Sequence, residues 1–565
     1  MEKAARSRRF ITRIAATLTV LTLGSSLSAC TVEWSTSTSS DTQTNSSATD
    51  PQLVAAYNAA AYEDVADGGT LTTALPQLGQ QQNIFHADAG GEVAQLWSWY
   101  NPQVMLTSQD GTYTPNPDYI TSVNTTTQGN QVVTLTLNDK AVFNDNTPID
   151  WTAIAATWKI NNGEDPAFRP ASTAGYEAIS SVTAGETPKQ AIITFNGTYP
   201  QWESLFTTIA HPTLTDPAVY NSYLGETMES LGAGPYTVSS VSIDSTTNTG
   251  TVTLTPNPQW WGKPGKLTER TFIAQDPEAA ATSFVQGGLD AVALTTSEQL
   301  AAATQLPQGT QLRTSTGTTV SFLRLNPASP VFADPAVREA FAQAIDREAV
   351  ANAYTAGLAA SGVSSPEAEA VPTGSVISTP DSSAYRDNFA AVASTDPAKA
   401  GAALEAAGWL AGEDGMRSKD GKPLTARYTV FGNSQSAQEV ANAIVEMGKA
   451  IGMTIELDNQ DVEDFAGIVS RGDFDILPLT YTVTDPVPAH HIGAVYGQQG
   501  SGVETDLLAD VTTIPEFVAP QIVAVRSDLA NYGAFGFATV PVENVGYRTA
   551  EVSPSASATV AAPAQ

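Results

Sequence analysis

The sequence contains few cysteines, histidines and basic residues. Its 565 residues include one Cys and four His, and 26 Lys and Arg stand against 58 Asp and Glu, which gives a formal net charge of −32. A single Cys excludes an intramolecular disulfide framework and a multi-cysteine metal site. The shortage of basic residues excludes a general nucleic-acid-binding protein, because a phosphate backbone is bound by clustered Lys and Arg.

The sequence also lacks the motifs of common catalytic sites. It has no G-x-S-x-G, H-E-x-x-H, C-x-x-C or P-loop motif. We therefore predict that the chain is not an enzyme and has no cofactor or metal ion, and that any ATP hydrolysis belongs to a partner. His490 and His491 are adjacent, so their side chains point in different directions, and we expect them at the surface or at a helix end rather than in a metal site.

The overall composition is that of a large globular protein. Hydrophobic residues make up 42% and charged residues 15%, which is typical of neither a disordered nor a membrane-embedded chain. At ~100 to 200 residues per domain, the length predicts several domains or one large body with several lobes.

The lone cysteine lies at the end of a secretory signal. Basic residues cluster within residues 1–13, an uncharged stretch covers 14–29, and Leu27-Ser28-Ala29-Cys30 follows. The uncharged stretch is shorter than the ~20 residues of a spanning helix. Leu-Ser-Ala-Cys resembles the bacterial lipobox, which implies that Cys30 becomes the lipid-modified first residue of the mature protein. The alternative is an ordinary signal with an incidental Cys, and Ser7-Arg8-Arg9-Phe10 leaves twin-arginine export open beside the general secretory route.

Strand and helix signals alternate from about Asp67 onward. The runs VVTLTL (132–137), AIITF (191–195) and TVTLT (251–255) predict strands. Three helices are each predicted to begin at an Asp-Pro pair, because Asp caps free N–H groups and Pro needs no donor at the first helical position. Those pairs are Asp276-Pro277, Asp334-Pro335 and Asp396-Pro397. The chain is therefore predicted to be mixed α/β.

Several sequence blocks follow one another in the order and spacing of a known family. They are Ala141–Ile149 (AVFNDNTPI), Gly232–Tyr236 (GAGPY), Asn257–Gly262 (NPQWWG), Gly288–Asp290 (GLD), Phe322–Glu348, Ala407–Trp409 (AGW) and Gly472–Ile476 (GDFDI). The first is similar to F-x-D-G-x-P, the second to G-T-G-P-Y and the fifth to P-F-x-D-x-x-V-R-x-A. Together they resemble family 5 of the bacterial extracellular solute-binding proteins, lipoproteins that serve ABC importers of oligopeptides, dipeptides and nickel.

The resemblance implies a two-lobed, periplasmic-binding-protein-like (Venus flytrap) α/β fold with an extra subdomain in the first lobe. Ligand would bind between the lobes, and its binding would shift the population from an open to a closed form. The expected segments are a signal peptide (1–29), a Ser/Thr-rich tether (30–66), lobe I (67–99 and 221–319) with its extra subdomain (100–220), lobe II (320–515), a return to lobe I (516–550) and a disordered tail (551–565).

The resemblance also implies a site for a peptide's positive end. Peptide-binding members place an Asp after an aromatic-containing strand, in a W-x-D-Y-x-x-P region, and the matching stretch here is Leu479–Pro488. Asp485 is thus the candidate anchor for the α-amino group, and Tyr481, which stands in place of Trp, is a candidate aromatic wall. As an alternative, Asp485-Pro486 repeats the helix-capping pair described above.

An aromatic group near the start of the body supplies further candidates. Trp97, Trp99 and Tyr100 are close together in sequence, and we expect them to line the cleft near the first crossing between the lobes. The alternative is that they belong to the hydrophobic core.

One departure from the family pattern lies between Gly502 and Arg526. Family members usually place a helix of about 30 residues between an Asp-Leu-Leu-like and an Ile-Pro-like segment, whereas here the two segments adjoin. Loss of that helix is expected to expose a hydrophobic face, at a cost of ~25 cal/mol per Å², and to alter the cleft.

Two functions from different classes remain open. The first is a monomeric, lipid-anchored receptor on the extracytoplasmic face of the cell membrane, which binds oligo- or dipeptides and delivers them to the permease and ATPase subunits of an ABC importer. The second is an envelope accessory lipoprotein that binds or regulates lipid or glycan precursor synthesis on the same fold.

Overall fold

The computed structural model describes residues 56–222, 228–244, 246–303, 306–360, 368–432, 434–497 and 503–549. Cys30, the predicted signal peptide and the predicted tail lie outside these residues. Among the helices of the described part, none is long and apolar enough to cross a membrane.

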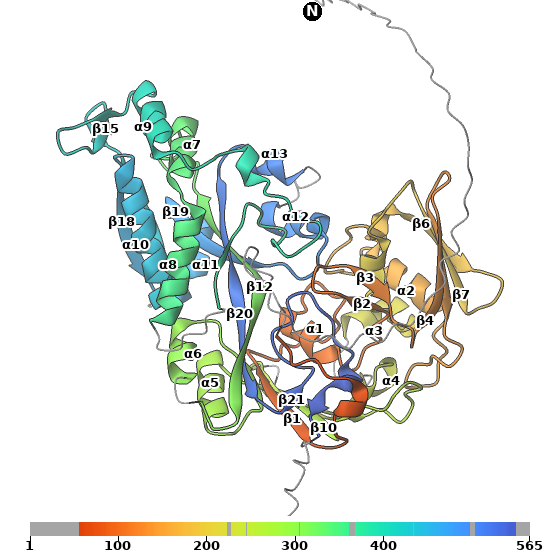
Figure 1. Ribbon diagram of the computed structural model, residues 1–565. Coiled ribbons are helices and arrows are strands. Elements are labelled where there is room, and N and C mark those ends of the chain that lie inside the picture. The colour runs from red at the N-terminus through yellow and green to blue at the C-terminus, as the bar shows by residue number, and fades with distance from the viewer. Residues whose placement is uncertain are drawn as a thin grey trace, which may run out of the picture. The chain divides into compact units, whose positions relative to one another are not determined.

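An 11-stranded mixed sheet passes through most of the described chain (Figure 1). Its path runs through β18 (Thr454–Gln460), β17 (Thr425–Phe431), β19 (Ile476–Thr482), β12 (Thr310–Leu325), β20 (Thr513–Arg526), β11 (Ala291–Ala293), β1 (Thr70–Leu75), β10 (Glu269–Ala274), β9 (Thr249–Pro256) and β8 (Tyr236–Asp244), and β13 (Val371–Pro372) pairs with β20. The predicted strand at 251–255 lies within β9 and is confirmed.

β12 and β20 connect the two halves of this sheet. They are antiparallel and contain 16 and 14 residues. The C-terminal half of β12 also pairs with β19, while the end of β20 pairs with β11. Two register shifts interrupt their pairing, and at the first of them a Cβ on Gly317 would lie 2.3 Å from the carbonyl oxygen of Ala519. The close approach of the two strands therefore requires glycine at position 317.

A second, antiparallel sheet lies within residues 120–195. Its order is β4 (Ile120–Thr126), β5 (Val132–Leu137), β7 (Gln190–Phe195) and β6 (Ile179–Ala184). The predicted strands at 132–137 and 191–195 correspond to β5 and β7. Alternate side chains of these strands, such as Val133 and Ile193, are fully buried in one hydrophobic cluster with α2 (Trp151–Asn161), because successive residues of a strand face opposite sides.

The three helices predicted from Asp-Pro pairs are confirmed. They are α5 (Pro277–Val285), α7 (Pro335–Ala344) and α9 (Pro397–Ala406), and in each the Asp carboxylate accepts a hydrogen bond from a backbone N–H of the first turn. Such a cap contributes ~1 kcal/mol. The other helices are α1 (Gly91–Trp97), α3 (Pro217–Asn221), α4 (Met228–Leu231), α6 (Ser297–Ala302), α8 (Arg347–Ala359), α10 (Gln435–Ala450), α11 (Phe465–Arg471), α12 (Pro488–Tyr496) and α13 (Glu504–Leu508).

Different helices cover the two faces of the sheet around β12. Leu323 and Phe517 pack with α7, α8, α9 and α10 in one hydrophobic cluster, and Val320 and Val518 pack with Val495 of α12 in another. Figure 1 shows α8 and α10 on one side of β12 and β20 and α12 on the other. Three small sheets complete the described fold: β2 (Met105–Thr107) with β3 (Tyr113–Pro115), the three-stranded β14 (Leu410–Ala411), β15 (Arg417–Lys419) and β16 (Lys422–Pro423), and β21 (Leu529–Ala530) with β22 (Gly546–Tyr547).

The structure corrects the end of the predicted tether. Residues 56–66 were expected to be flexible, but Ala56 and Val65 form bridges to Ala534 and Arg548. Asn531 explains the attachment, because its side-chain amide accepts from the N–H of Ala60 and donates to the carbonyl of the same residue. This segment therefore belongs to the folded body.

The shortened junction between α13 and β20 is also well packed. Leu508, Val511 and Ile514 are at most 2% exposed and belong to the cluster that includes α7 to α10. The prediction that this junction exposes a hydrophobic face is wrong for these residues, because the neighbouring helices cover them. Exposed apolar side chains among the described residues include Val503 just before α13, at 66%, and Val462, Phe465 and Val469 on and just before α11, which are between 39% and 66% exposed.

Candidate functional site

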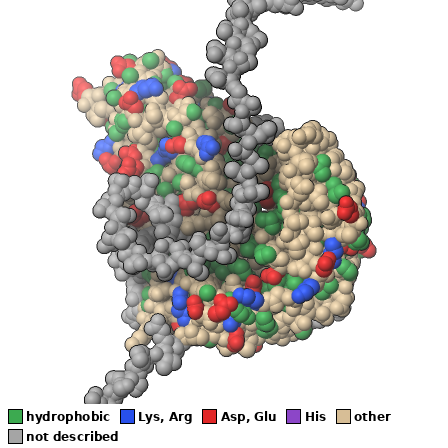
Figure 2. Space-filling model, turned by 45° about the vertical axis from the view of Figure 1, so that its right-hand side comes forward, with side chains coloured by type: hydrophobic (Ala, Val, Ile, Leu, Met, Phe, Trp, Pro, Cys, Tyr) green, Lys and Arg blue, Asp and Glu red, His purple; other side chains and the backbone are tan. Residues whose placement is uncertain are grey.

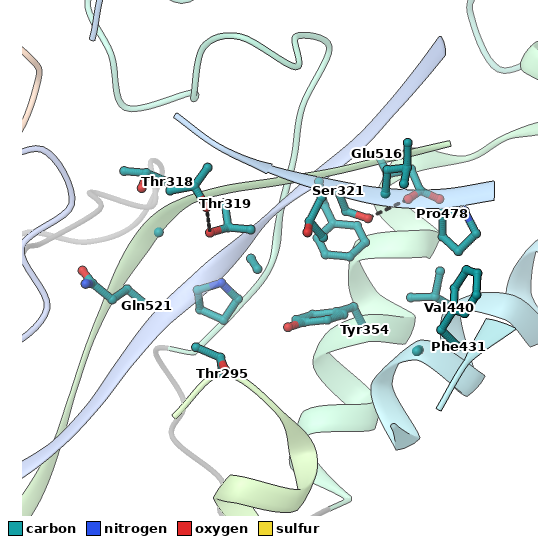
Figure 3. Close-up of a pocket in the computed structure, with 18 of the residues that line it drawn as sticks. Thr295, Thr318, Thr319, Ser321, Tyr354, Phe431, Val440, Pro478, Glu516 and Gln521 are labelled. Atoms are coloured by element: carbon teal, nitrogen blue, oxygen red, sulfur yellow. Dashed lines mark hydrogen bonds between the residues drawn. The ribbon is translucent and has the colours of Figure 1, made fainter. Parts of the chain in front are cut away.

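A cavity of about 720 Å³ lies against the paired strands β12 and β20 (Figure 3). Its walls come from the end of β11 and Thr295 on one side of that pair, and from β17, β19, α8, α10 and α11 on the other. Elements from both halves of the large sheet therefore meet at the cavity. Its size is within the ~300 to 1,000 Å³ of ordinary small-molecule sites.

The lining of the cavity is apolar and aromatic, with hydroxyl groups on one side. The aromatic side chains are Tyr354, Tyr428, Phe431, Phe465 and Phe517. The hydroxyl groups are those of Thr295, Thr318, Thr319, Ser321, Thr480 and Thr482, with Thr319 and Thr482 oxygens 3.1 Å apart. Such a surface accepts apolar groups and offers a few hydrogen-bond partners for their polar atoms.

Glu516 is the one charged side chain among the described residues that line the cavity. It sits at the second register shift of β20, where Ser321 is opposite Phe517 and Phe322 is opposite Pro515. A β-bulge of this kind redirects a side chain and ends regular pairing. The hydroxyl of Ser321 donates to Glu516 Oε2 at 2.8 Å, and Figure 3 shows this contact at the cavity wall. Burial raises the pKa of the Glu516 carboxyl to about 7, although the Ser321 hydrogen bond opposes the shift.

Aromatic side chains around Glu516 are held by regular elements. Tyr354 lies on α8, whose first turn is capped by Asp346, and its ring lies 4.7 Å from that of Phe517. Burial raises the pKa of Tyr354 to about 12, so its hydroxyl stays protonated. The pKa of Tyr428 is raised as well, first by burial and then by the charge of Glu516. The site thus combines one carboxyl group with neutral aromatic walls.

β19 links this cavity to the predicted anchor. Thr480 and Thr482 line the cavity, whereas Tyr481 between them contacts His491 of α12, with 2.9 Å between Tyr481 Oη and His491 Nδ1. This is the alternation of a strand, in which successive side chains face opposite sides. Asp485 follows three positions after Thr482.

Asp485 is held by two histidines and by its own loop. Its Oδ2 lies 3.1 Å from His490 Nδ1, its Oδ1 accepts from the N–H of Val487, and its carbonyl oxygen lies 2.9 Å from His491 Nε2. Burial raises the pKa of the carboxyl, but the hydrogen bond and charge of His490 outweigh burial and leave the pKa below its ordinary value. The side chain is 29% exposed. Since α12 begins at Pro488 and Val487 precedes it, Asp485 is not the N-cap of that helix.

The two histidines lie at the start of α12, a helix end as one of the two predicted alternatives had it, and not at the surface. The side chains of His490 and His491 are 11% and 3% exposed, because Asp485 and tyrosines provide their hydrogen bonds. His490 Nε2 lies 3.1 Å from the hydroxyl of Tyr199, which follows β7. Burial lowers the pKa of His491 although Asp485 opposes the shift. Among the described residues, no group of three or more His, Cys, Asp or Glu is placed to hold a metal ion.

The three remaining candidate residues belong to the hydrophobic core and not to the cavity. Trp97, Trp99 and Tyr100 are at most 5% exposed and belong to the core cluster around β1 and β10. The indole N–H of Trp97 donates to the side-chain oxygen of Gln82. None of the three lines the cavity of Figure 3. Asp485 and Tyr481, by contrast, share His491 as a neighbour.

Sequence reasoning did not single out Glu516 as a candidate. The available signal was a Glu inside an otherwise apolar strand, Ile514-Pro515-Glu516-Phe517-Val518, since an acidic residue in such a run is rarely buried without a reason. The distribution of charge does not point to a binding surface either, because acidic and basic side chains lie intermixed on the face shown in Figure 2.

Comparison with known proteins identifies relatives across most of the chain. The family model described as bacterial extracellular solute-binding proteins, family 5 middle, matches residues 114–502. The oligopeptide-binding protein OppA of Mycobacterium tuberculosis is 30% identical over 521 residues, which is 85% of each chain. A second protein of that organism, the probable monoacyl phosphatidylinositol tetramannoside-binding protein LpqW, is 28% identical over 241 residues, 42% of this chain and 36% of LpqW.

Solved structures share the fold. The periplasmic EDTA-binding protein EppA superposes with a TM-score of 0.71 at 23% identity and covers 87% of this chain and 98% of its own. The oligopeptide-binding protein AppA of Bacillus subtilis, in complex with a nonapeptide, gives a TM-score of 0.60 at 14% identity over 86% of this chain and 100% of its own. The mixed α/β architecture is therefore that of periplasmic binding proteins.

Proposed function

Because this chain belongs to the bacterial extracellular solute-binding proteins of family 5, which are binding proteins and not enzymes, we propose that it captures peptides and presents them to an ABC importer. The observation that carries the proposal is the cavity at β12 and β20, which both halves of the large sheet line. Its apolar and aromatic walls suit side chains of varied shape, and its hydroxyl groups suit backbone amides. The similarity to OppA over 85% of both chains supports a peptide as the ligand.

Asp485 is the proposed anchor of the peptide's α-amino group. Its carboxylate is kept ionised by His490 and is partly exposed. A carboxylate has about four acceptor positions, and Val487 and His490 use two of them, which leaves capacity for an ammonium group. Tyr481, at the same end of β19, is the proposed wall beside it.

Closure of two lobes is the proposed mechanism of capture. In this division lobe I comprises 67–319 and 516–550, with 100–220 as its extra subdomain, and lobe II comprises 320–515. The strands that cross between them, β12 and β20, provide the hinge, and a ligand that contacts both lobes favours the closed form by its additional contacts. The permease would then recognise the closed form.

Anchoring through Cys30 is proposed to keep the receptor at the extracytoplasmic face of the membrane. The lipobox-like Leu27–Cys30 supports lipid attachment, and the acidic composition supports it indirectly, since a chain with net charge −32 gains nothing from anionic lipid head groups.

Native mass spectrometry of the purified protein tests the proposal. We expect co-purifying peptides that are released on unfolding, and rebinding of pentapeptides from a random library after refolding. Absence of any bound peptide, both as purified and after exposure to the library, would contradict peptide binding.

A second candidate function is an envelope accessory protein that binds a lipid or glycan precursor. The mainly apolar wall of the cavity favours it, as does the partial similarity to LpqW. In the same mass spectra this function would produce an adduct of lipid mass that organic solvent extracts, in place of peptides.

A further inference from the structure

The buried carboxyl group of Glu516 has fewer hydrogen-bond partners than a buried carboxyl group with a purely structural role. Glu504 offers the comparison, since it is 2% exposed and Glu516 is 0% exposed. The carboxylate of Glu504 accepts four hydrogen bonds, from Ser375, Val376, Asn388 and Tyr496. Glu504 is therefore fully satisfied within the fold.

The carboxyl of Glu516 receives far less compensation. Ser321 donates to Oε2, while Oε1 is buried without a hydrogen-bond partner among the described residues. No Lys, Arg or His of the described chain forms an ion pair with it. Burial of an uncompensated carboxylate is unfavourable, and Glu516 carries the one charge among the described residues that line the cavity.

The surroundings of Glu516 suit a positive charge carried on an apolar chain. Five aromatic rings line the same cavity, among them those of Tyr354, Tyr428 and Phe431. The faces of such rings attract ammonium and guanidinium groups, and the remaining apolar wall accommodates the methylene stem of such a side chain. The Glu516 carboxylate would repel an anionic ligand, and no basic residue among the described lining residues would offset that repulsion.

We propose that this cavity is a subsite for an organic cation, in which Glu516 pairs with the ammonium or guanidinium group of a ligand and the aromatic walls enclose its methylene chain. The inference rests on the proposed function in taking that group to be a Lys or Arg side chain of a bound peptide.

A pair of small probes tests the subsite without a peptide. Binding of n-hexylamine and 1-hexanol is measured at pH 8 by calorimetry and thermal shift on the purified full-length protein, on Glu516→Gln and on Glu446→Gln. The last variant makes the same charge change on an exposed residue of α10, which lies 72% exposed beside Lys449. We expect hexylamine to bind about tenfold more weakly to Glu516→Gln, hexanol to bind both proteins alike, and Glu446→Gln to match the wild type.

A peptide arm separates this inference from the proposed function. Pentapeptides retained from a random library are sequenced for the wild type and for Glu516→Gln, and we expect Lys and Arg to be enriched with the wild type alone. Retention of peptides without that enrichment, together with equal hexylamine binding by wild type and Glu516→Gln, overturns the cation subsite and leaves peptide binding intact. Glu516-dependent hexylamine binding without retained peptides supports the subsite and counts against a peptide as its ligand.

Discussion

Tyr199 and His490 meet although 291 positions separate them in sequence, with 3.1 Å between Tyr199 Oη and His490 Nε2. Tyr199 packs against the cluster of the four-stranded sheet, and His490 lies on α12, beyond the end of β19. His490 in turn contacts Asp485 through Nδ1. This pair therefore connects the four-stranded sheet to the carboxylate that we propose as the amino-group anchor.

Tyr199→Phe should weaken ligand binding modestly. Loss of the hydroxyl removes the hydrogen bond between Tyr199 and His490 of α12, which is worth ~0.5 to 1.5 kcal/mol. We therefore expect the affinity for co-purified peptide to fall by about two- to tenfold. Calorimetric titration measures it. Tyr176→Phe is the matched control, since Tyr176 donates to the carbonyl of Leu205 within the same cluster. Equal affinities for the two variants would count against a role of the Tyr199–His490 contact in closure.

Asp485→Asn should abolish discrimination between free and blocked amino termini. The amide keeps an acceptor for the Val487 N–H but loses the negative charge, so binding of a free-amino peptide should fall at least about tenfold. The N-acetylated peptide should bind wild type and variant alike, with a small change in melting temperature. A large drop in melting temperature with an unchanged preference for free amines would indicate that Asp485 is a structural residue.

Glu516 should make the stability of the protein depend on pH. Its carboxyl has a pKa of about 7 in the folded protein and an ordinary value of 4.5, so the folded state holds a proton that the unfolded state loses between these pH values. Stability therefore falls as pH rises from 4.5 to about 7, by about 3 kcal/mol, and then levels off. Urea unfolding at pH 4.5 and pH 8 should show a loss that is about 3 kcal/mol smaller in Glu516→Gln than in the wild type and in Glu446→Gln, because burial also raises the pKa of Glu543 and of Asp381 and their contribution remains in all three proteins. A loss of the same size in Glu516→Gln would assign it to other groups.

Cys30→Ser should release the protein from the membrane. Without the thiol no lipid is attached, and the uncharged stretch before it is too short to span a bilayer. We expect the variant in the aqueous phase of a Triton X-114 partition and the wild type in the detergent phase. Detergent partitioning of both proteins would show that another segment anchors the chain.

The regular elements were largely readable from local signals. The Asp-Pro pairs located the starts of α5, α7 and α9, because an N-cap and a first-turn proline act within a few residues. Alternation of apolar side chains identified β5 and β9 in the same way. The extent of the tether was misjudged, since the attachment of residues 56–66 depends on Asn531, far away in the chain.

The site was less accessible to such reasoning. Asp485 and Tyr481 were proposed as ligand contacts from their place in a family pattern, and the structure puts both beside His491. His490 and His491 were expected at the surface or at a helix end, and their burial at the start of α12 was not foreseen because a sequence does not show that Tyr199 and Tyr481 supply their partners. Trp97 was a cleft candidate by composition, whereas its 1% exposure shows a core position.

The sequence by itself determined the mixed α/β pattern and the family, since each rests on residues close together or on blocks whose order is visible along the chain. The tertiary structure alone decided which side chains share a cavity. Ser321 and Glu516 are 195 positions apart, and a bulge in β20 turns the second toward a wall built by β17, β19 and α8. Burial then raises the pKa of this carboxyl, and burial is a property of the folded chain rather than of any segment of its sequence.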